Sequence, residues 1–465
     1  MIIWLDSKRW LINISFLKSR SLRAIRMRIL LINSPARLDA KPNCIPSGLA
    51  TVASTLMAAG WNVEFYDINA FRPRENAIVS DLETKTWDLV GISGLITTYN
   101  FQKWLIPILK RIQPNAPVIS GGGLATTSSQ LLFDRTPLDI SVIGEGEITM
   151  LEICRALQSG TDLAEVAGIR FRRNEQIVET APREIIDNLD SIPFPAWNLI
   201  PMEIYLENPI WGDVANNSSG FRRDVKVNRS MNIISSRGCP FSCNYCYHLF
   251  GRSSYRIRSV RNVVNEIEIL VDRYGVDFIG FVDDNLMVSK KWLAEFCSEM
   301  EKKRFPLTWG CHGRVSSAEP EILDRMAGAG CVWIGYGIES GSRKMLKAMN
   351  KKATVEEAKD AVRNTRRAGI YPNTTFIFGY PGETRETIWE TIDFKRETGI
   401  ECGSFFATPY PGTPLYEQMK DRIGDEEAFI GRLGNATDFS INLTEFDDAS
   451  LFELKKTMDA NLAVT

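Results

Sequence analysis

Two separate series of short apolar strands alternating with amphipathic helices constrain what this chain can fold into. The first series begins at Arg28, with strands expected at 29–33, 63–67, 89–93, 118–120 and 140–143. Such alternation predicts a parallel sheet with helices on both faces. An open sheet of this kind binds its ligand at the carboxyl ends of its strands. We therefore expect a doubly wound, Rossmann-like α/β domain over residues 28–160.

The second series begins at Met231. Its strands are expected at 231–236, 278–282, 307–311, 332–338, 374–378 and 404–408, with helices between them. Six strand–helix units are too few to close an eight-fold barrel, so we predict a partial (β/α)6 TIM barrel over residues 231–414. A capping box at Thr354 and Glu357 marks the start of one of the helices.

Three segments lie outside these two series. Residues 161–230 predict a hairpin around Asn174 followed by a Pro-rich stretch at 192–196, which together form a linker or clasp. Residues 415–465 predict a short helical tail. Residues 1–27 form a basic extension that is a poor secretory signal, and we expect the native chain to start at Met27. A basic segment lying on a membrane surface is the alternative for this extension.

Composition excludes several classes of protein. A net charge of -2 over 465 residues argues against a protein whose main task is to bind nucleic acid. No apolar run is long enough to span a bilayer. The nine cysteines are an odd number without regular spacing, which indicates a reducing compartment, and we expect a cytoplasmic protein.

Three of the cysteines form a CxxxCxxC motif directly after the first strand of the second series. Cys239, Cys243 and Cys246 could hold three irons of a [4Fe–4S] cubane and leave the fourth iron open to a substrate. A zinc site with His248 as fourth ligand is the alternative. Position favours the cluster, because polar residues follow the next strands and meet at the same mouth of a barrel. These residues are Asp283, Asp284, Arg314 and Glu339.

The motif, with Tyr245 before its last cysteine, resembles that of the radical S-adenosylmethionine (SAM) superfamily. The resemblance implies that the open iron binds SAM and that an electron from the cluster splits SAM to a 5′-deoxyadenosyl radical. It places Tyr245 near the adenine, Glu339 of Gly-Ile-Glu-Ser-Gly at a polar group of SAM, and Arg314 at its carboxylate. Asp283 and Asp284 would contact the amino group, although either could instead be a solvated strand end or a helix cap.

The preceding domain, the Pro-Phe-Pro stretch and Arg-Gly-Cys-Pro together resemble the cobalamin-binding branch of that superfamily. Ser93-Gly-Leu95 matches its SxL signature, Gly121-Gly122 matches its GG signature, and Glu145 lies in a Gly-Glu-Gly-Glu turn typical of the branch. The DxHxxG signature is missing, so the first domain offers no histidine as a lower ligand of cobalt. Glycine-rich turns also bind nucleotides, which is the alternative for this domain.

The resemblance implies cobalamin-dependent methylation of an unactivated carbon of a small-molecule or lipid-like substrate, with a flavodoxin- or ferredoxin-type electron donor. A ring-forming cyclase of the anaerobic magnesium-protoporphyrin monomethyl ester type is the alternative within the branch. A non-catalytic iron–sulfur electron-transfer or binding protein is the alternative of another class. Tyr247 and His312 are the candidate acid or base groups, and a packed or hydrogen-bonded role in the fold is the alternative for both. A basic cluster after the cysteines could meet an anionic substrate, although solvated loop cations are commoner: Arg252, Arg256, Arg258 and Arg261.

Overall fold

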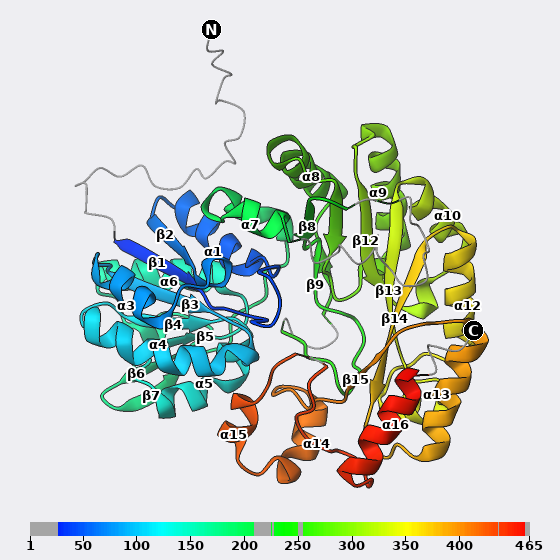
Figure 1. Cartoon of the computed structure of the whole chain (residues 1–465). Helices are drawn as coiled ribbons and strands as arrows, with labels where there is room; N and C mark the ends of the chain where they lie inside the picture. Colours follow the sequence, from blue (N-terminus) through cyan, green and yellow to red (C-terminus); the bar gives the residue numbers. More distant parts are fainter. Residues whose placement is uncertain (1–26, 209–224, 226, 250–253, 436, 461–465) are drawn as a thin grey trace.

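The computed structural model describes residues 27–460 apart from 209–224, 226, 250–253 and 436. The predictions for the extension before Met27 and for Arg252 therefore lie outside the described residues. Two α/β bodies lie side by side, joined by linking segments and by the C-terminal helices (Figure 1).

The first body contains a seven-stranded sheet in the order β2-β1-β3-β4-β5-β6-β7. Five strands are parallel, as predicted: β1 (Arg28–Asn33), β2 (Asn62–Asp67), β3 (Leu89–Ser93), β4 (Val118–Gly121) and β5 (Ile140–Val142). The predicted hairpin forms from β6 (Ile169–Arg173) and β7 (Gln176–Glu179) and adds to the edge of this sheet antiparallel to β5. The hairpin predicted in the linker thus completes the sheet of the first domain.

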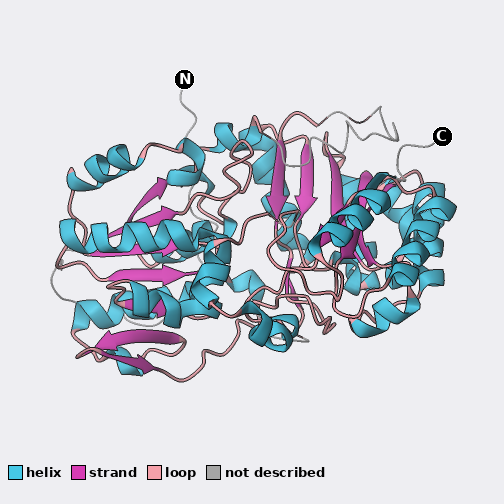
Figure 2. Cartoon of the chain, turned by 60° about the horizontal axis from the view of Figure 1, so that its bottom comes forward, coloured by secondary structure: helices cyan, strands magenta, loops and turns pink. Residues whose placement is uncertain are grey.

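Helices cover both faces of this sheet (Figure 2). Alternate residues of β1 point to opposite faces, so Ile29 and Leu31 belong to one apolar core, while Leu30 and Ile32 belong to the other. The helices are α1 (Ser47–Ala58), α2 (Ile68–Phe71), α3 (Glu75–Glu83), α4 (Tyr99–Ile112), α5 (Gly123–Arg135) and α6 (Gly146–Ser159). A further helix, α7 (Met202–Leu206), belongs to the linker.

The second body is the predicted partial barrel. Six parallel strands follow the order β15-β14-β13-β12-β11-β8. They are β8 (Ser230–Ile233), β11 (Phe278–Phe281), β12 (Thr308–Gly313), β13 (Cys331–Glu339), β14 (Tyr371–Phe378) and β15 (Ser404–Phe406). The outer helices are α8 (Val260–Tyr274), α9 (Lys290–Lys303), α10 (Pro320–Gly328), α11 (Arg343–Ala348), α12 (Val355–Arg367) and α13 (Arg385–Thr398). The predicted capping box starts α12, where Thr354 and Glu357 exchange hydrogen bonds.

The C-terminal tail connects the two bodies, a role that its sequence did not reveal. Its helices are α14 (Pro414–Ile423), α15 (Glu426–Gly431) and α16 (Asp448–Ala460). Phe429 and Ile430 pack into the core of the first domain, and Glu427 accepts a hydrogen bond of 2.9 Å from the hydroxyl of Tyr99. The last helix returns to the barrel, where Asp459 accepts a hydrogen bond from the backbone N–H of Ser404 at the edge strand β15. The tail therefore fastens one domain against the other (Figure 1).

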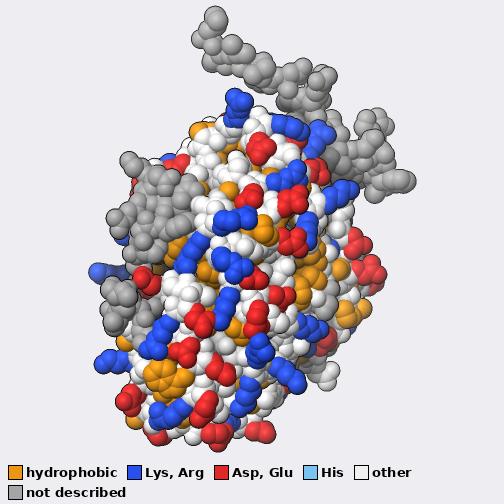
Figure 3. Space-filling model, turned by 90° about the vertical axis from the view of Figure 1, so that its right-hand side faces the viewer, with side chains coloured by type: hydrophobic (Ala, Val, Ile, Leu, Met, Phe, Trp, Pro, Cys, Tyr) orange, Lys and Arg blue, Asp and Glu red, His pale blue; other side chains and the backbone are white. Residues whose placement is uncertain are grey.

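Basic and acidic side chains alternate over the outer face of the half-barrel (Figure 3). On this face the residues that the structure describes form no large area of a single charge. No helix within the described part of the chain is long and apolar enough to cross a membrane.

Candidate functional site

The cysteine loop leaves the half-barrel after β8 and is framed by a short antiparallel ribbon. This ribbon consists of β9 (Ser236–Arg237) and β10 (Arg256–Ile257). Gly238 turns the chain with a φ of +84°, and a Cβ atom there would collide with the carbonyl of Ser254, so only glycine fits. Further along, the backbone N–H of Asn244 donates to the carbonyl of Met349 at 3.0 Å. The loop is thus tied down at both ends.

The three predicted ligands Cys239, Cys243 and Cys246 lie close enough to influence one another electrostatically, and all are free thiols. Burial is the main cause that raises the pKa of Cys246 to about 12 and raises that of Cys239. Within the described part of the chain, no three histidine, cysteine or carboxylate side chains have converged to metal-ligand geometry. The donor set and its single short loop nevertheless suit a cubane, because soft thiolates are the ligands that iron–sulfur clusters take.

Arg314, which follows β12, lies against this loop. Its Nη1 is 3.6 Å from the sulfur of Cys243, and its guanidinium stacks on the ring of Phe241 at 3.7 Å. Nη2 donates to the backbone carbonyls of Lys351 and Lys352. The planar guanidinium thus joins the cysteine loop to the segment after α11. The contact of Arg314 with the SAM carboxylate stays a prediction.

Tyr245 and Glu339 were predicted separately, and the structure brings them together. The hydroxyl of Tyr245 donates to Oε1 of Glu339 at 2.9 Å. Burial, and secondarily the Glu339 carboxylate, raise the pKa of Tyr245 well above its ordinary value. Glu339 itself has a φ of +70°, a left-handed conformation that costs a non-glycine residue free energy and is typical of functional sites.

Lys351 is the member of this group that sequence reasoning missed. Its Nζ lies 2.9 Å from Oε1 of Glu339 and 3.3 Å from the hydroxyl of Tyr245, and its side chain is buried. In the sequence it stands in the polar run Asn-Lys-Lys, which is typical of a solvated helix end. A lysine is rarely buried without a partner, and the ion pair with Glu339 places Lys351 beside two residues of the predicted SAM site.

The two aspartates after β11 differ in environment. Asp283 is fully buried, and its carboxylate accepts hydrogen bonds from the backbone and hydroxyl groups of Ser235 and Ser236. Burial raises the pKa of Asp283, and burial together with the neighbouring Asp283 raises that of Asp284. Asp284 is open to the mouth and lies near Cys239 and Cys246, whereas Asp283 braces the turn that leads into the cysteine loop. Their contact with the SAM amino group stays a prediction.

The candidate acid and base groups lie in two different parts of the molecule. His312 faces the lumen of the half-barrel with its ring edge-on to Trp333, and enclosure there lowers its pKa to about 4. Tyr247 lies between the domains, near the place where a Cβ on Gly123 or Gly412 would be, and burial raises its pKa to about 12. At neutral pH the histidine is therefore neutral and the phenol keeps its proton, so neither is a strong base.

Two glycines make room for the rings of His312 and Trp333 on the sheet of the half-barrel. A Cβ atom on Gly310 would lie 3.0 Å from the carbonyl oxygen of Trp333, and one on Gly335 would lie 2.6 Å from Nδ1 of His312. Larger residues at these positions would collide with His312 or Trp333, so the glycines make room for these two rings.

A cavity of about 190 Å³ opens at the carboxyl ends of the strands of the first domain. The predicted Ser93, Gly121, Gly122 and Glu145 line it together with apolar side chains of the sheet and of α1. At Gly121 and Gly144 a Cβ atom would meet nothing within 4 Å, so backbone forms the wall there. Such a cradle fits the tail of a large planar cofactor better than it fits a small polar metabolite.

The two short signatures of the first domain contact each other. The backbone N–H of Gly94 donates to the carbonyl of Gly121 at 3.3 Å, and the N–H of Leu124 donates to the carbonyl of Gly94 at 3.2 Å. Leu95 is 59% exposed and lies on the rim beside Gly123. The loops after β3 and β4 therefore form one surface at the strand ends.

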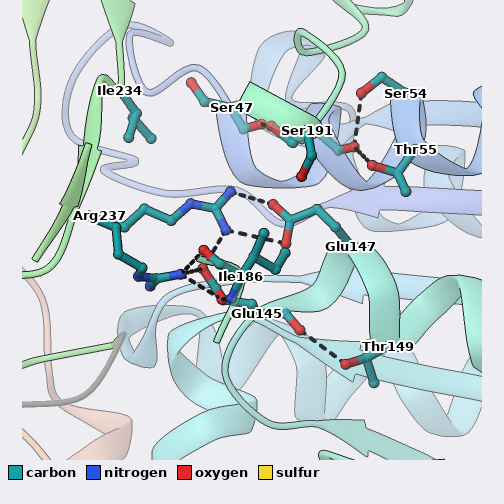
Figure 4. A network of polar contacts seen from close by, with 12 residues as sticks. Ser47, Ser54, Thr55, Glu145, Glu147, Thr149, Ile186, Ser191, Ile234 and Arg237 are labelled. Atoms are coloured by element: carbon teal, nitrogen blue, oxygen red, sulfur yellow. Dashed lines mark hydrogen bonds and ion pairs between the residues drawn. The ribbon is translucent and has the colours of Figure 1, made fainter. Parts of the chain in front are cut away.

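The second domain also contributes to this cavity. Phe194 of the Pro-Phe-Pro stretch lines it, as do Ile234, Arg237 and Arg258 of the half-barrel. Arg237 forms an ion pair of 2.6 Å with Glu145, whose carboxylate also accepts the backbone N–H of Ile186 (Figure 4). The predicted cofactor contact of Glu145 stays a prediction; in the structure its oxygens meet protein groups.

The predicted basic cluster is largely paired inside the protein. Arg256 is bound to Glu145, and Arg258 forms an ion pair of 2.5 Å with the buried Glu266. Arg261, at the start of α8, is exposed. Of the three arginines of this cluster that the structure describes, Arg256 and Arg258 therefore serve the fold around the cavity, which weakens the case for an anionic substrate there.

Comparison with known proteins identifies the family. Residues 34–154 match the B12 binding domain family and residues 233–394 match the Radical SAM superfamily. The chain is 31% identical over 399 residues to an uncharacterized methyltransferase of Pyrococcus horikoshii, and the match covers 84% of this chain and 83% of that protein. This chain belongs to the radical SAM enzymes that carry a B12-binding domain.

Two further known proteins are similar to this radical SAM enzyme. It is 29% identical over 388 residues to the anaerobic magnesium-protoporphyrin IX monomethyl ester cyclase of Cereibacter sphaeroides, covering 81% of this chain and 61% of the cyclase. It superposes on the radical S-adenosylmethionine methyltransferase TsrM from Kitasatospora setae with a TM-score of 0.70 at 20% identity, over 86% of this chain and 77% of TsrM. The latter match shows a common fold. The predicted family, enzyme class and architecture are confirmed.

Proposed function

We propose that this radical SAM enzyme methylates an unactivated carbon, with cobalamin in the cavity of the first domain and a [4Fe–4S] cluster on Cys239, Cys243 and Cys246. One observation carries the proposal: Arg237 lines the cavity and stands two residues before the first cysteine. The cavity and the cysteine loop thus belong to one interface between the domains. Chemistry that uses both cofactors on one substrate requires such proximity.

When bound, the reduced cluster supplies the electron that splits SAM to a radical, and cobalamin supplies a methyl carrier. The residues of this chain bind and orient these groups. Arg314, close to Cys243, offers a guanidinium fork that suits the SAM carboxylate, and Glu339 offers a carboxylate at the barrel mouth. Tyr247, whose ring lies near Gly123 and Gly412, holds its proton at neutral pH.

The name of the Pyrococcus horikoshii relative supports methyl transfer, and the cyclase relative supports the alternative of oxidative ring formation. Anaerobically reconstituted and reduced protein with cobalamin, SAM and substrate separates the two. Methylation of a carbon–hydrogen bond consumes two SAM molecules, so 5′-deoxyadenosine and S-adenosylhomocysteine should accumulate together. Deoxyadenosine with no S-adenosylhomocysteine would refute methyl transfer and favour the cyclase type.

We further propose that the substrate is a small or lipid-like molecule and that a flavodoxin or ferredoxin in the cytoplasm reduces the cluster. Metabolite profiles of a deletion strain, compared with the parent, test this directly. A substrate that accumulates should carry one methyl group fewer than the compound that disappears.

A further inference from the structure

Four buried charged residues join the first domain to the base of the cysteine loop. Arg237 pairs with Glu145 at 2.6 Å through Nη1 and with Glu147 at 2.5 Å through Nη2. Arg256 pairs with Glu145 at 2.9 Å and also donates to the backbone carbonyl of Ile186 at 2.7 Å. Figure 4 shows the guanidinium of Arg237 between the two glutamates. We call these four residues the interdomain bracket: Glu145, Glu147, Arg237 and Arg256.

The bracket is deeply buried and balanced in charge. Its glutamate side chains are 3% and 5% exposed, and its arginine side chains are 12% and 8% exposed. Two carboxylates face two guanidinium groups, so removal of one charge leaves another uncompensated in a region of low dielectric. A buried ion network of this kind contributes little net stability over an apolar contact, and its best-attested use is to fix one geometry.

The two halves of the bracket belong to the two cofactor sites. Arg237 and Arg256 are directly paired in the β9–β10 ribbon, which frames the cysteine loop, and Cys239 follows two residues after Arg237. Glu145 and Glu147 stand at the start of α6, where Gly144, with a φ of +76°, turns the chain along the wall of the cavity. Movement of either half must therefore move the other or break a buried ion pair.

We propose that the interdomain bracket couples the two cofactors thermodynamically, so that a loaded cluster tightens the binding of cobalamin and bound cobalamin slows loss of the cluster. This inference rests on the proposed function. Its physical basis is ordering. A cluster that ties three cysteines of one loop fixes the backbone of Arg237. Through the ion pairs of Arg237, the cluster also orders the turn at Gly144. Cobalamin then loses less conformational entropy on binding, because it does not have to order this turn itself. Coupling of this kind is reciprocal for binding equilibria.

The test measures hydroxocobalamin binding to the full chain by absorbance, first with the cluster reconstituted and then after its removal by oxidation and chelation. For the wild-type protein we expect the dissociation constant to be roughly tenfold lower with the cluster present, within the 5- to 150-fold range of allosteric couplings. In Glu147→Gln, which keeps the shape of the side chain but removes one of the two ion pairs of Arg237, the ratio should fall clearly below the wild-type value. Arg237→Lys, which keeps the charge and loses the fork, should also lower it.

The matched control is Glu427→Gln. Glu427 also joins the domains, by ion pairs with Lys103 and Arg135, but it lies on α15 away from the cavity and the cysteine loop. This control should keep the wild-type ratio, and circular dichroism should show all variants folded. The reciprocal readout is the rate of iron loss to a chelator, which hydroxocobalamin should slow in the wild type and in Glu427→Gln more strongly than in Glu147→Gln.

The outcomes distinguish the inference from the function beneath it. A wild-type ratio near one, or an equal ratio in wild type, Glu147→Gln and Arg237→Lys, would overturn the coupling while leaving cobalamin binding intact. A wild-type chain that binds no hydroxocobalamin in either form would overturn both proposals. Loss of the ratio in Glu427→Gln as well would assign the effect to domain contact in general and would also overturn a specific role for the bracket.

Discussion

Replacing Lys351 with methionine removes the cation from a buried ion pair while keeping an unbranched side chain of similar length. Nζ of Lys351 and Oε1 of Glu339 lie 2.9 Å apart, and the two side chains are 8% and 9% exposed. Breaking a buried pair by removing one partner costs ~3–5 kcal/mol, because the remaining charge stays desolvated. We expect Lys351→Met to lower the free energy of unfolding by that amount.

A double-mutant cycle isolates this pair. Glu339→Gln removes the other charge and keeps a hydrogen-bonding group for Tyr245, so the double variant should regain much of the stability that Lys351→Met loses. The exposed pair of Arg343 with Glu356 provides a matched control, because its side chains are 77% and 59% exposed. Arg343→Met should cost far less than Lys351→Met, because solvent screens an exposed pair.

Chemical denaturation, followed by circular dichroism and by tryptophan fluorescence, measures all four variants. Strictly additive losses in the cycle would show that Lys351 and Glu339 do not interact. A loss in Lys351→Met no larger than that in Arg343→Met would contradict the burial argument. Either result would also remove the reason to treat Lys351 as part of the predicted SAM site.

Three other perturbations probe separate parts of the structure. Arg314→Lys keeps the charge but loses the guanidinium fork and its stacking on Phe241. The denaturation midpoint should fall by the equivalent of ~1.5–3 kcal/mol for each hydrogen bond lost. An unchanged midpoint would contradict the observed contacts. Burial raises the pKa of Glu383 to about 7 from an ordinary value of 4.5, so the folded state binds this proton more tightly than the unfolded state. Protonated Glu383 therefore contributes to the free energy of unfolding. This contribution is fully present below pH 4.5 and is lost as the pH rises through 7, a change of at most about 3 kcal/mol. The unfolding midpoint of Glu383→Gln should therefore rise relative to wild type between pH 5 and pH 8, and a constant difference would show that Glu383 does not titrate there. Gly121→Leu places a side chain in the open space at the cavity wall. The affinity for hydroxocobalamin should therefore fall at least about tenfold, while the iron content stays unchanged. A variant that binds hydroxocobalamin as tightly as the wild type would exclude this cavity as the cobalamin site.

Much of the fold follows from local sequence patterns. The alternation of strands and helices predicts both sheets, because a period of two and a period of 3.6 are visible within a few residues. The hairpin around Asn174 is predicted for the same reason, and Asn174 indeed has a positive φ in the tight turn. The cysteine motif needs only eight residues to be seen.

What the sequence conceals is contact between distant residues. Lys351 lies in a polar run and is buried only because β13 brings Glu339 beside it. Glu145 stands in a turn that resembles a cofactor site, yet its partners Arg237 and Arg256 lie about a hundred residues further along the chain. Phe429 looks like an ordinary residue of a helical tail. It packs into the core of the first domain only because the chain, after completing the half-barrel, runs back to that domain. No local period encodes these pairings.

Formation of 5′-deoxyadenosine by anaerobically reconstituted and dithionite-reduced protein tests the central claim most directly. We predict that the wild-type chain binds about four irons, as a [4Fe–4S] cluster requires, and cleaves SAM, and that Cys243→Ala, which lacks one of the three thiolates, does neither. Electron paramagnetic resonance of the reduced wild type should change when SAM is added, because SAM reaches the open iron. A fully loaded wild-type protein that leaves SAM intact, or a Cys243→Ala variant that cleaves it equally well, would contradict the account.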